Sequence, residues 1–382
     1  MSNARNLANL LGTGSTIATA KIADGVFSAN KNMVINGAME VFQRATAATA
    51  AAGGYETADR FIMGETSGGA YTTERSTDHP TSSGYSLKAQ VTTADTSLSA
   101  AHYAYIFQKI EAQNLQHLAY GTSSAKTLTL SFFVKSNKTG TYTVNLYKPD
   151  GTGYIFVQEY TINSADTWEK KTITISPTAG STSFITASAG AIANDNGSGL
   201  EVGFSLAWGS NYTGGTSGSW SSNTNHYATT NQVNWLDSTS NNFYLTQIQL
   251  EVGDQGTPFE HPRSYGDELQ RCKRYFNQWS DGDKTYHSLG IGTMYTSTYL
   301  QGGFELDVEM RAVPTLVQVN SSSAYGCSVH GAFPQFDTFS GLDGGTTEKA
   351  VVLYRNGSIS STQGASGPMY AVSNKLALDA EL

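Results

Sequence analysis

The side chains of this sequence that are best suited to bind a ligand are aromatic, and they gather between residues 209 and 242. This stretch is poor in apolar residues and rich in Gly, Ser, Thr and Asn. An aromatic ring offers a sugar a flat apolar platform, and Asn and Ser supply hydrogen bonds to its hydroxyl groups. The alternative, which is favoured, is structural: the rings fix a long loop to the fold or lie in a subunit interface. The candidate glycan-binding residues are Tyr212, Trp220, His226, Tyr227 and Trp235.

Enzymatic chemistry has little support in the sequence. The seven histidines are scattered, with no pair at the spacing of metal ligands. The sequence contains no Gly-x-Ser-x-Gly elbow and no phosphate-binding loop. Asp281 and Asp283, taken with Asp337 or Asp343, would supply the two carboxylates of a glycosidase, but acidic turn residues explain them better. We therefore expect a protein that is not an enzyme, with no catalytic residue and no metal site.

Two glutamates near the end of the predicted sandwich, Glu251 and Glu260, are the residues to which Ca²⁺ would bind. Backbone carbonyls would have to supply the remaining oxygen ligands, and no Asp-rich loop accompanies these glutamates. Solvated carboxylates are the better interpretation, so we expect no cofactor.

Charged residues are scarce in this chain of 382 residues. They make up 14% of the sequence, against about 25% in an ordinary domain, and 23 basic against 31 acidic residues give a net charge of −8. So few basic residues argue against nucleic-acid binding. No apolar run approaches the length of about 18 residues that a membrane helix needs, and the first residues lack the apolar core of a secretory signal. Cys272 and Cys327 are too few for a disulfide framework and are expected to be buried thiols, which suits folding in a reducing cytoplasm.

Short strands punctuated by turns dominate residues 31–262. The alternation of Leu87, Ala89 and Val91 is typical of a half-buried strand. About ten such strands with no helical period between them predict an all-β fold, an antiparallel β-sandwich of the jelly-roll type. The expected strands are 33–35, 40–42, 59–63, 85–91, 103–110, 127–135, 142–147, 154–157, 168–175, 200–208 and 243–251.

A single good helix follows the sandwich and predicts a connector over residues 263–279. Ser264 and Asp267 resemble a capping box, and Tyr265, Leu269 and Cys272 fall on one helical face. Residues 280–382 return to strands, with 295–304, 315–319 and 350–354 the clearest. They predict a second, smaller β-domain at the C-terminal, distal end of the protein.

Residues 1–30 differ from the rest because they have too few apolar side chains to bury a core. We expect an extended N-terminal arm that becomes ordered only against a partner or a neighbouring copy. Its short apolar patch supplies the candidate anchor residues Asn6, Leu7, Leu10 and Leu11.

Two long motifs, in the same order, resemble a family of phage and prophage virion proteins described as tail-fibre, head-fibre or minor structural proteins. The opening motif is NMVINGAMEVFQR at 32–44, and the closing motif is NNFYLTQIQLEVG at 241–253, followed by TPFEHPRSYGDEL at 257–269. The arm at 5–11 is similar to the N-terminal anchors of marine phage fibres. The resemblance covers about residues 32–276 and implies a jelly roll similar to carbohydrate-binding modules.

This resemblance implies a virion structural protein, assembled in the host cytoplasm and located in the virion. The expected form is a homotrimeric fibre that the arm attaches to other virion proteins. One function would be recognition of a host-surface glycan through the β-domains. The alternative is a purely structural capsid, tail or decoration component without a ligand, and a polysaccharide depolymerase is the least supported candidate.

Overall fold

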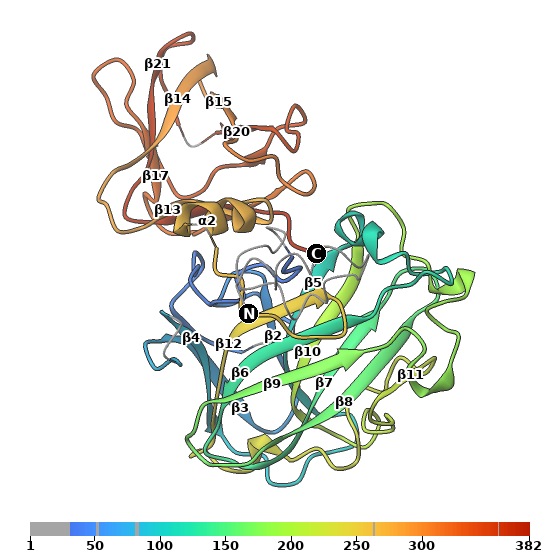
Figure 1. The fold of residues 1–382 in the computed structure, drawn as a ribbon. Helices are drawn as coiled ribbons and strands as arrows, with labels where there is room; N and C mark the ends of the chain where they lie inside the picture. Colours follow the sequence, from blue (N-terminus) through green and yellow to red (C-terminus); the bar gives the residue numbers. More distant parts are fainter. Residues whose placement is uncertain (1–30, 51–52, 81–83, 263, 358) are drawn as a thin grey trace, which may run out of the picture. The chain divides into compact units, whose positions relative to one another are not determined.

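The fold described here is that of a computed structural model, which describes residues 31–50, 53–80, 84–262, 264–357 and 359–382. The described chain is all-β, with antiparallel sheets and one α-helix among its described elements (Figure 1), so the predicted fold class is confirmed. The predicted arm and its anchor residues Asn6, Leu7, Leu10 and Leu11 lie outside the described residues.

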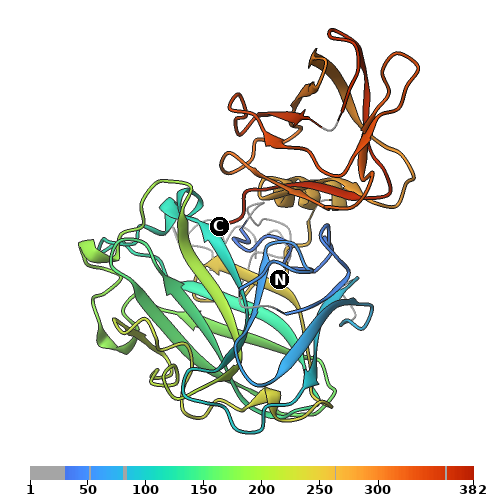
Figure 2. The ribbon, with the colours of Figure 1, turned by 180° about the vertical axis from the view of Figure 1, so that it is seen from behind.

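Residues 47–252 form two six-stranded antiparallel sheets that face each other as a sandwich (Figures 1 and 2). The first sheet has the order β1 (Ala47–Thr49), β3 (Ala70–Ser76), β4 (Ser86–Thr93), β12 (Asn242–Val252), β6 (Leu128–Lys135) and β9 (Glu169–Ile175). The second sheet has the order β11 (Ser219–Ser221), β8 (Tyr154–Ile162), β7 (Gly140–Lys148), β10 (Ser198–Trp208), β5 (Tyr103–Glu111) and β2 (Phe61–Glu65).

The core lies between these two sheets, and the period of two in the sequence places it there. In β4, Leu87, Ala89 and Val91 all point inward and are buried, as their alternation predicts. In β5 the even positions Ala104 and Ile106 join the same core, so the odd positions of that strand must lie on the opposite, outer face.

The segment 33–42 forms no strand, which corrects the two strands expected there. Asn36 adopts a left-handed backbone with φ of 59° and buries its side chain. Its Oδ1 accepts hydrogen bonds from the amides of Glu40 and Val41, both at 2.9 Å. These side-chain bonds replace the ladder bonds that a strand would make, so the apolar residues of this segment pack as a compact turn.

This turn packs against an irregular part of β12. The pairing of β12 with β6 shifts register between Thr246 and Gln249, and Gln247 has a φ of 51°. The amide of Ile248 there donates to the carbonyl of Gly37 at 3.0 Å. The opening and closing motifs of the sequence are therefore neighbours in the fold.

Helix α2 (Tyr265–Lys273) begins where the sequence predicts, with the Ser264 hydroxyl accepting from the amide of Asp267 at 3.1 Å. Its buried face differs from the expected one. Tyr265 is 56% exposed, whereas Glu268 is buried and accepts a hydrogen bond from the amide of Asn36. The free thiol of Cys272 is buried, as expected, and so is that of Cys327 in β17 (Tyr325–Cys327).

The chain after α2 forms two further antiparallel sheets around its own apolar clusters. One has the order β13 (Phe276–Asp281), β22 (Lys375–Asp379) and β16 (Thr315–Gln318). The other has the order β18 (Gln335–Phe336), β17, β21 (Ser366–Ala371), β14 (His287–Thr296), β15 (Tyr299–Glu305), β20 (Ala350–Asn356) and β19 (Gly341–Leu342). The single strand expected over 295–304 is thus the end of β14, a turn at 297–298 and most of β15.

Ion pairs join the end of the chain to the sandwich. The Arg60 guanidinium, only 1% exposed, pairs with Glu381 and lies over the Tyr275 ring at 3.5 Å from its centroid. Arg44 pairs with Asp379 at 3.1 Å. The carboxylate of Asp59, the neighbour of Arg60 in the sequence, is buried and accepts hydrogen bonds from Gln43. Within the described residues no helix is long and apolar enough to cross a membrane.

Candidate functional site

An aromatic wall lines a cavity of about 260 Å³ on the outer face of the second sandwich sheet. The residues of its floor belong to the strands β5, β7 and β10, which are labelled in Figure 1, and those of one side belong to the 209–242 loop. The lining residues are Tyr103, Tyr105, Phe107, Asn145, Glu201, Gly203, Trp208, Tyr212, Asn225 and Tyr227.

Strand alternation positions most of this wall. Tyr103, Tyr105 and Phe107 occupy alternate positions of β5, opposite to the core-facing Ala104 and Ile106. Ring contacts hold the row together. Tyr103 and Tyr105 are stacked with centroids 5.3 Å apart, and Phe107 is tilted by 40° against Tyr105 with centroids 4.8 Å apart. Because the row lies on a central strand of a paired sheet, the rings are held before any ligand arrives.

A β-bulge brings Trp208 into the wall. Along β10, Glu201 and Gly203 face outward, so simple alternation would turn Trp208 inward. The pairing of β10 with β5 shifts between Ser205 and Ala207, and Trp208 then lies opposite Tyr103. The extra residue changes the face on which the strand presents its last side chain, a known use of bulges beside binding sites.

The loop contributes Tyr212 and Tyr227, which the sequence analysis proposed. Tyr227 stacks on Trp208 with a centroid distance of 4.8 Å, and Tyr212 meets Trp208 edge-on at 5.1 Å. The carbonyl of Tyr227 accepts from the Ser205 hydroxyl at 3.1 Å and from the Asn145 amide at 3.3 Å. The loop is therefore tied to the sheet at the point where its ring enters the cavity.

Among the described residues that line the cavity, the polar groups are neutral apart from Glu201. Burial raises the pKa of Glu201, and the Lys109 charge and a hydrogen bond from Ser198 oppose this shift only in part. Burial, followed by the negative charge of Glu201, raises the pKa of Tyr227 to about 12. Burial likewise raises the pKa of Tyr105 well above its usual value. Both phenols therefore remain protonated donors at neutral pH.

One donor in the wall has no partner. Trp208 is only 8% exposed, and its indole Nε1 is buried and makes no hydrogen bond among the described residues. An unpaired buried donor costs about 1–3 kcal/mol, and such groups are rare in folded proteins. This donor belongs to a residue that lines the cavity.

The structure separates the five loop residues proposed from the sequence. Trp220 and Trp235 are buried in the sandwich core, where their Nε1 groups donate to the carbonyls of Ser176 at 2.9 Å and Asn242 at 3.0 Å. A buried indole offers no face to a sugar, so these two residues are removed from the candidate site. They fix the long loop to the fold, which was the structural alternative given for these rings.

His226 also has a local role. Its Nδ1 lies 3.1 Å from the Ser221 hydroxyl and its Nε2 lies 2.9 Å from the Asn223 amide, so both ring nitrogens are used within the loop. Tyr212 and Tyr227 are the members of the proposed group that line the cavity.

Sequence reasoning missed the β5 row and Trp208. The signal for the row was available, because Tyr, Tyr and Phe recur at every second residue of 103–107, with small or aliphatic residues between them. An aromatic outer face on a predicted sandwich strand is an exposed apolar patch that calls for an explanation. The bulge that redirects Trp208 left no comparable signal.

The two glutamates considered as Ca²⁺ ligands hold structural positions, which corrects their interpretation as solvated carboxylates. Glu251 is buried and accepts from the amide of Thr257 at 2.8 Å and from its hydroxyl at 2.7 Å. Glu260 accepts from the amide of Asn32 at 2.9 Å. These bonds fix the segment that follows β12 to the end of that strand and to Asn32.

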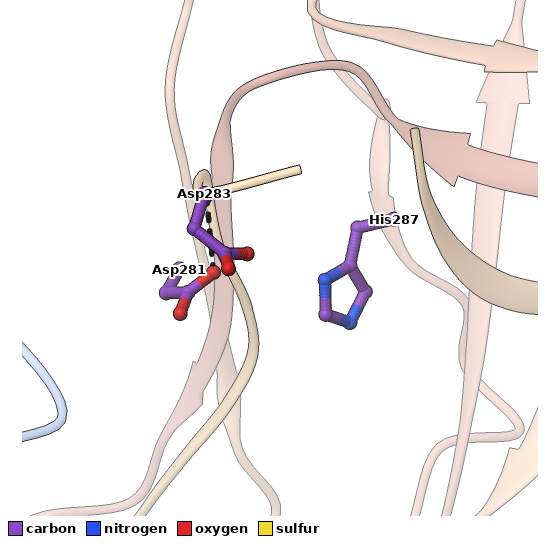
Figure 3. A group of neighbouring side chains, drawn as sticks. All are labelled: Asp281, Asp283 and His287. Carbon is purple, nitrogen blue, oxygen red and sulfur yellow. Dashed lines mark hydrogen bonds between the residues drawn. The ribbon is translucent and has the colours of Figure 1, made fainter. Parts of the chain in front are cut away.

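A second grouping of polar side chains lies in the C-terminal sheets (Figure 3). Ligand atoms of Asp281, Asp283 and His287 lie within 4.8 Å of one another, and the amide of Asp283 donates to the Asp281 carboxylate at 3.1 Å. The sequence analysis did not connect His287 with the two aspartates. Both carboxylates are exposed, and Lys284 already pairs with Asp283 at 2.7 Å. This is an ordinary arrangement for an acidic surface turn.

Comparison with known proteins identifies no family for this chain. No family model matches it, and no curated protein matches it. The fold is similar to the enzymatically active domain of tailspike protein 4 of bacteriophage CBA120, at 12% identity over 58% of this chain and 22% of that chain, with a TM-score of 0.30.

Two carbohydrate-binding modules of Clostridium thermocellum show a similar likeness. The C-terminal family 22 module of Xyn10B has 12% identity over 60% of this chain and all of that chain, with a TM-score of 0.30. The family 11 module of a cellulosomal cellulase has 14% identity over 55% of this chain and 98% of that chain, with a TM-score of 0.29. Scores this low do not transfer a ligand or an activity to this chain.

Proposed function

We propose that the cavity on β5, β7 and β10 binds a carbohydrate. The observation that carries this proposal is the aromatic wall of the cavity, in which Trp208 and Tyr227 lie stacked. Sugars present apolar C–H faces together with hydroxyl groups, and they match a surface that offers rings beside neutral donors and acceptors. Asn145 and Asn225 supply such groups at the cavity.

The size of the cavity favours a short piece of glycan. Its 260 Å³ is slightly below the range of about 300–1,000 Å³ typical of small-molecule pockets. We therefore expect one or two sugar residues to make the contacts, as at the end or a branch of a longer chain.

A glycan array probed with the purified chain tests this function. The array should give specific binders, and Tyr227→Ala should weaken the best one at least tenfold, because it removes both a platform ring and the support of Trp208. Tyr265→Ala is the matched control, since Tyr265 is exposed on helix α2 and lies outside the cavity. Absence of any binder, or equal losses in the two variants, would reject the proposal.

We further propose that the protein is a phage virion component, a homotrimeric fibre that residues 1–30 attach to other virion proteins. The motifs at 32–44 and 241–253 support this proposal, and their contact in the fold explains why they occur together. Deletion of residues 1–30 should abolish incorporation into particles while the remaining chain still folds. Incorporation of the truncated chain would reject the role of the arm.

The second candidate function is a structural virion component without a ligand. The burial of Trp220 and Trp235 in the sandwich core favours it, because these two rings pack in the fold and face no ligand. We also propose that the protein is not an enzyme, since Glu201 is the sole carboxylate among the described residues of the cavity and a glycosidase uses two. Release of reducing sugar from a host polysaccharide would overturn this.

A further inference from the structure

Among the described residues that line the cavity, Glu201 is the single charged side chain. It lies on β10 between Lys109 of β5 and Tyr147 of β7, its partners in the two neighbouring ladders. Every other lining side chain is an aromatic residue, an asparagine or a glycine. A ligand in the cavity therefore meets one formal charge, and that charge is negative.

The charge of Glu201 is not cancelled by a close ion pair. Within the described residues no Lys, Arg or His nitrogen lies within 4.0 Å of its carboxylate. The positive charge of Lys109 lowers the pKa of Glu201, but its Nζ donates to the carbonyl of Leu382 at 3.1 Å instead. Ser198 gives Glu201 one long hydrogen bond of 3.5 Å. The carboxylate keeps free lone pairs for a ligand donor.

We propose that Glu201 makes the cavity selective for neutral or amino sugars and excludes acidic ones. This inference rests on the proposed carbohydrate-binding function and names the class of sugar that the site accepts. Uronic acids, sialic acids and sulfated sugars are the excluded class. Glu201 is a specificity-determining residue in this role.

Two physical effects lead to this selectivity. A sugar carboxylate or sulfate placed beside Glu201 would be desolvated next to a like charge, and such juxtapositions are a common way to reject a wrong partner. Hydroxyl groups of a neutral sugar can instead donate to the carboxylate, and an ammonium group of an amino sugar gives a stronger, charge-assisted bond. The aromatic wall itself is indifferent to this choice, because every pyranose has an apolar face.

The test compares glycans that share one backbone and differ only in charge. The probes are the neutral, amino and uronic acid forms of the same oligosaccharide, on backbones found to bind in a glycan array. Wild-type protein should bind the acidic form at least tenfold more weakly than the neutral form. High salt should reduce this discrimination, because screening weakens the repulsion.

The variant Glu201→Gln keeps the shape of the side chain and removes its charge. It should reduce the discrimination against the acidic form about tenfold or more, while binding of the neutral form changes little. Asp254→Asn is the matched control, since Asp254 is exposed, follows β12 in the other sheet and removes the same unit of charge. It should leave the discrimination unchanged.

The outcomes separate this inference from the proposed function. Equal binding of neutral and acidic forms by wild-type protein, or unchanged discrimination in Glu201→Gln, overturns the role of Glu201 and leaves carbohydrate binding intact. An equal effect of Asp254→Asn would show that the net charge of the chain is responsible, and it also overturns the inference. A wild-type protein that binds no form on any backbone rejects carbohydrate binding itself.

Discussion

The indole of Trp208 and the ring of Tyr227 lie stacked, with centroids 4.8 Å apart and planes inclined by 6°. Trp208 ends a central strand of the sheet, whereas Tyr227 belongs to the 209–242 loop. The candidate site is thus shared between a rigid strand and a loop, and the carbonyl of Tyr227 in that loop accepts hydrogen bonds from Ser205 and Asn145 of the sheet. The depth of the cavity depends on the size of the side chains that form its floor.

Gly203 sets the depth of that floor. A Cβ at this position would lie 2.4 Å from Oδ1 of Asn145, which is buried and bonded to Ser205 and Tyr227. We expect Gly203→Ala to displace Asn145, to weaken carbohydrate binding about tenfold and to lower the free energy of unfolding by about 1–3 kcal/mol. Calorimetric titration and denaturant unfolding measure the two effects.

Gly344→Ala is the control for this glycine, because a Cβ there meets no atom within 4 Å. It should change neither binding nor stability appreciably. Full binding by Gly203→Ala would show that the floor of the cavity does not contact the ligand.

Arg60 and Glu381 form a buried ion pair between the sandwich and the end of the chain, with side chains 1% and 5% exposed. Removing one partner of a buried pair typically costs about 3–5 kcal/mol, and the second pair of Glu381, with Arg44 at 3.3 Å, places the loss at the lower end of this range. We expect Arg60→Met to lower the free energy of unfolding by this amount, because it also removes the contact with the Tyr275 ring. Denaturant unfolding provides the measurement.

The exposed pair of Lys349 and Glu309, 3.4 Å apart, is the control for the buried pair. Both side chains are more than half exposed, so Lys349→Met should cost less than about 1 kcal/mol. Similar losses in Arg60→Met and Lys349→Met would show that the buried pair does not stabilise the fold.

Glu111 makes the stability of the fold depend on pH. Burial alone would raise its pKa, but hydrogen bonds from Arg274 at 2.7 Å and Tyr275 at 2.8 Å, with the Arg274 charge, outweigh burial and hold the pKa below its ordinary value of 4.5. A lowered pKa in the folded state contributes stability that is fully present above the unfolded value. This stability is lost as the pH falls through the folded value.

We therefore expect the free energy of unfolding to decrease as the medium is acidified below about pH 4.5. In Glu111→Gln this part of the acid dependence should be absent, and stability at neutral pH should be lower. Unfolding by denaturant across a series of pH values measures both. An identical acid slope in the variant would exclude Glu111 as its source.

How much of this fold the sequence predicts depends on whether local patterns decide the structure. The alternation in β4 and the Ser264 cap are local, and they are confirmed. The burial of Trp220 and Trp235 depends on the packing of a loop with no pattern of its own. Trp235, for example, meets the distant Tyr71 edge-on with centroids 5.5 Å apart.

The same contrast explains the error at 33–42. The apolar residues there fit a strand, but the Asn36 side chain bonds to the backbone in a geometry that composition does not reveal. In the candidate site, Tyr212 and Tyr227 were predictable from their aromatic character. Trp208 was not, because one extra residue between Ser205 and Ala207 reverses the face on which it lies.

Gly37 is required by the contact between the opening and closing motifs. A Cβ there would lie 2.2 Å from the carbonyl oxygen of Ile248. Two hydrogen bonds hold the Ile248 backbone in place: its amide donates to the carbonyl of Gly37, and its carbonyl accepts from the side-chain amide of Asn32. We expect Gly37→Ala to lower the free energy of unfolding by at least about 2 kcal/mol, because strand β12 and the turn cannot move apart without breaking these bonds. Denaturant unfolding beside Gly344→Ala measures the difference. Equal stability of the two variants would mean that the motifs do not depend on this contact, and their joint occurrence would then need a cause outside the fold.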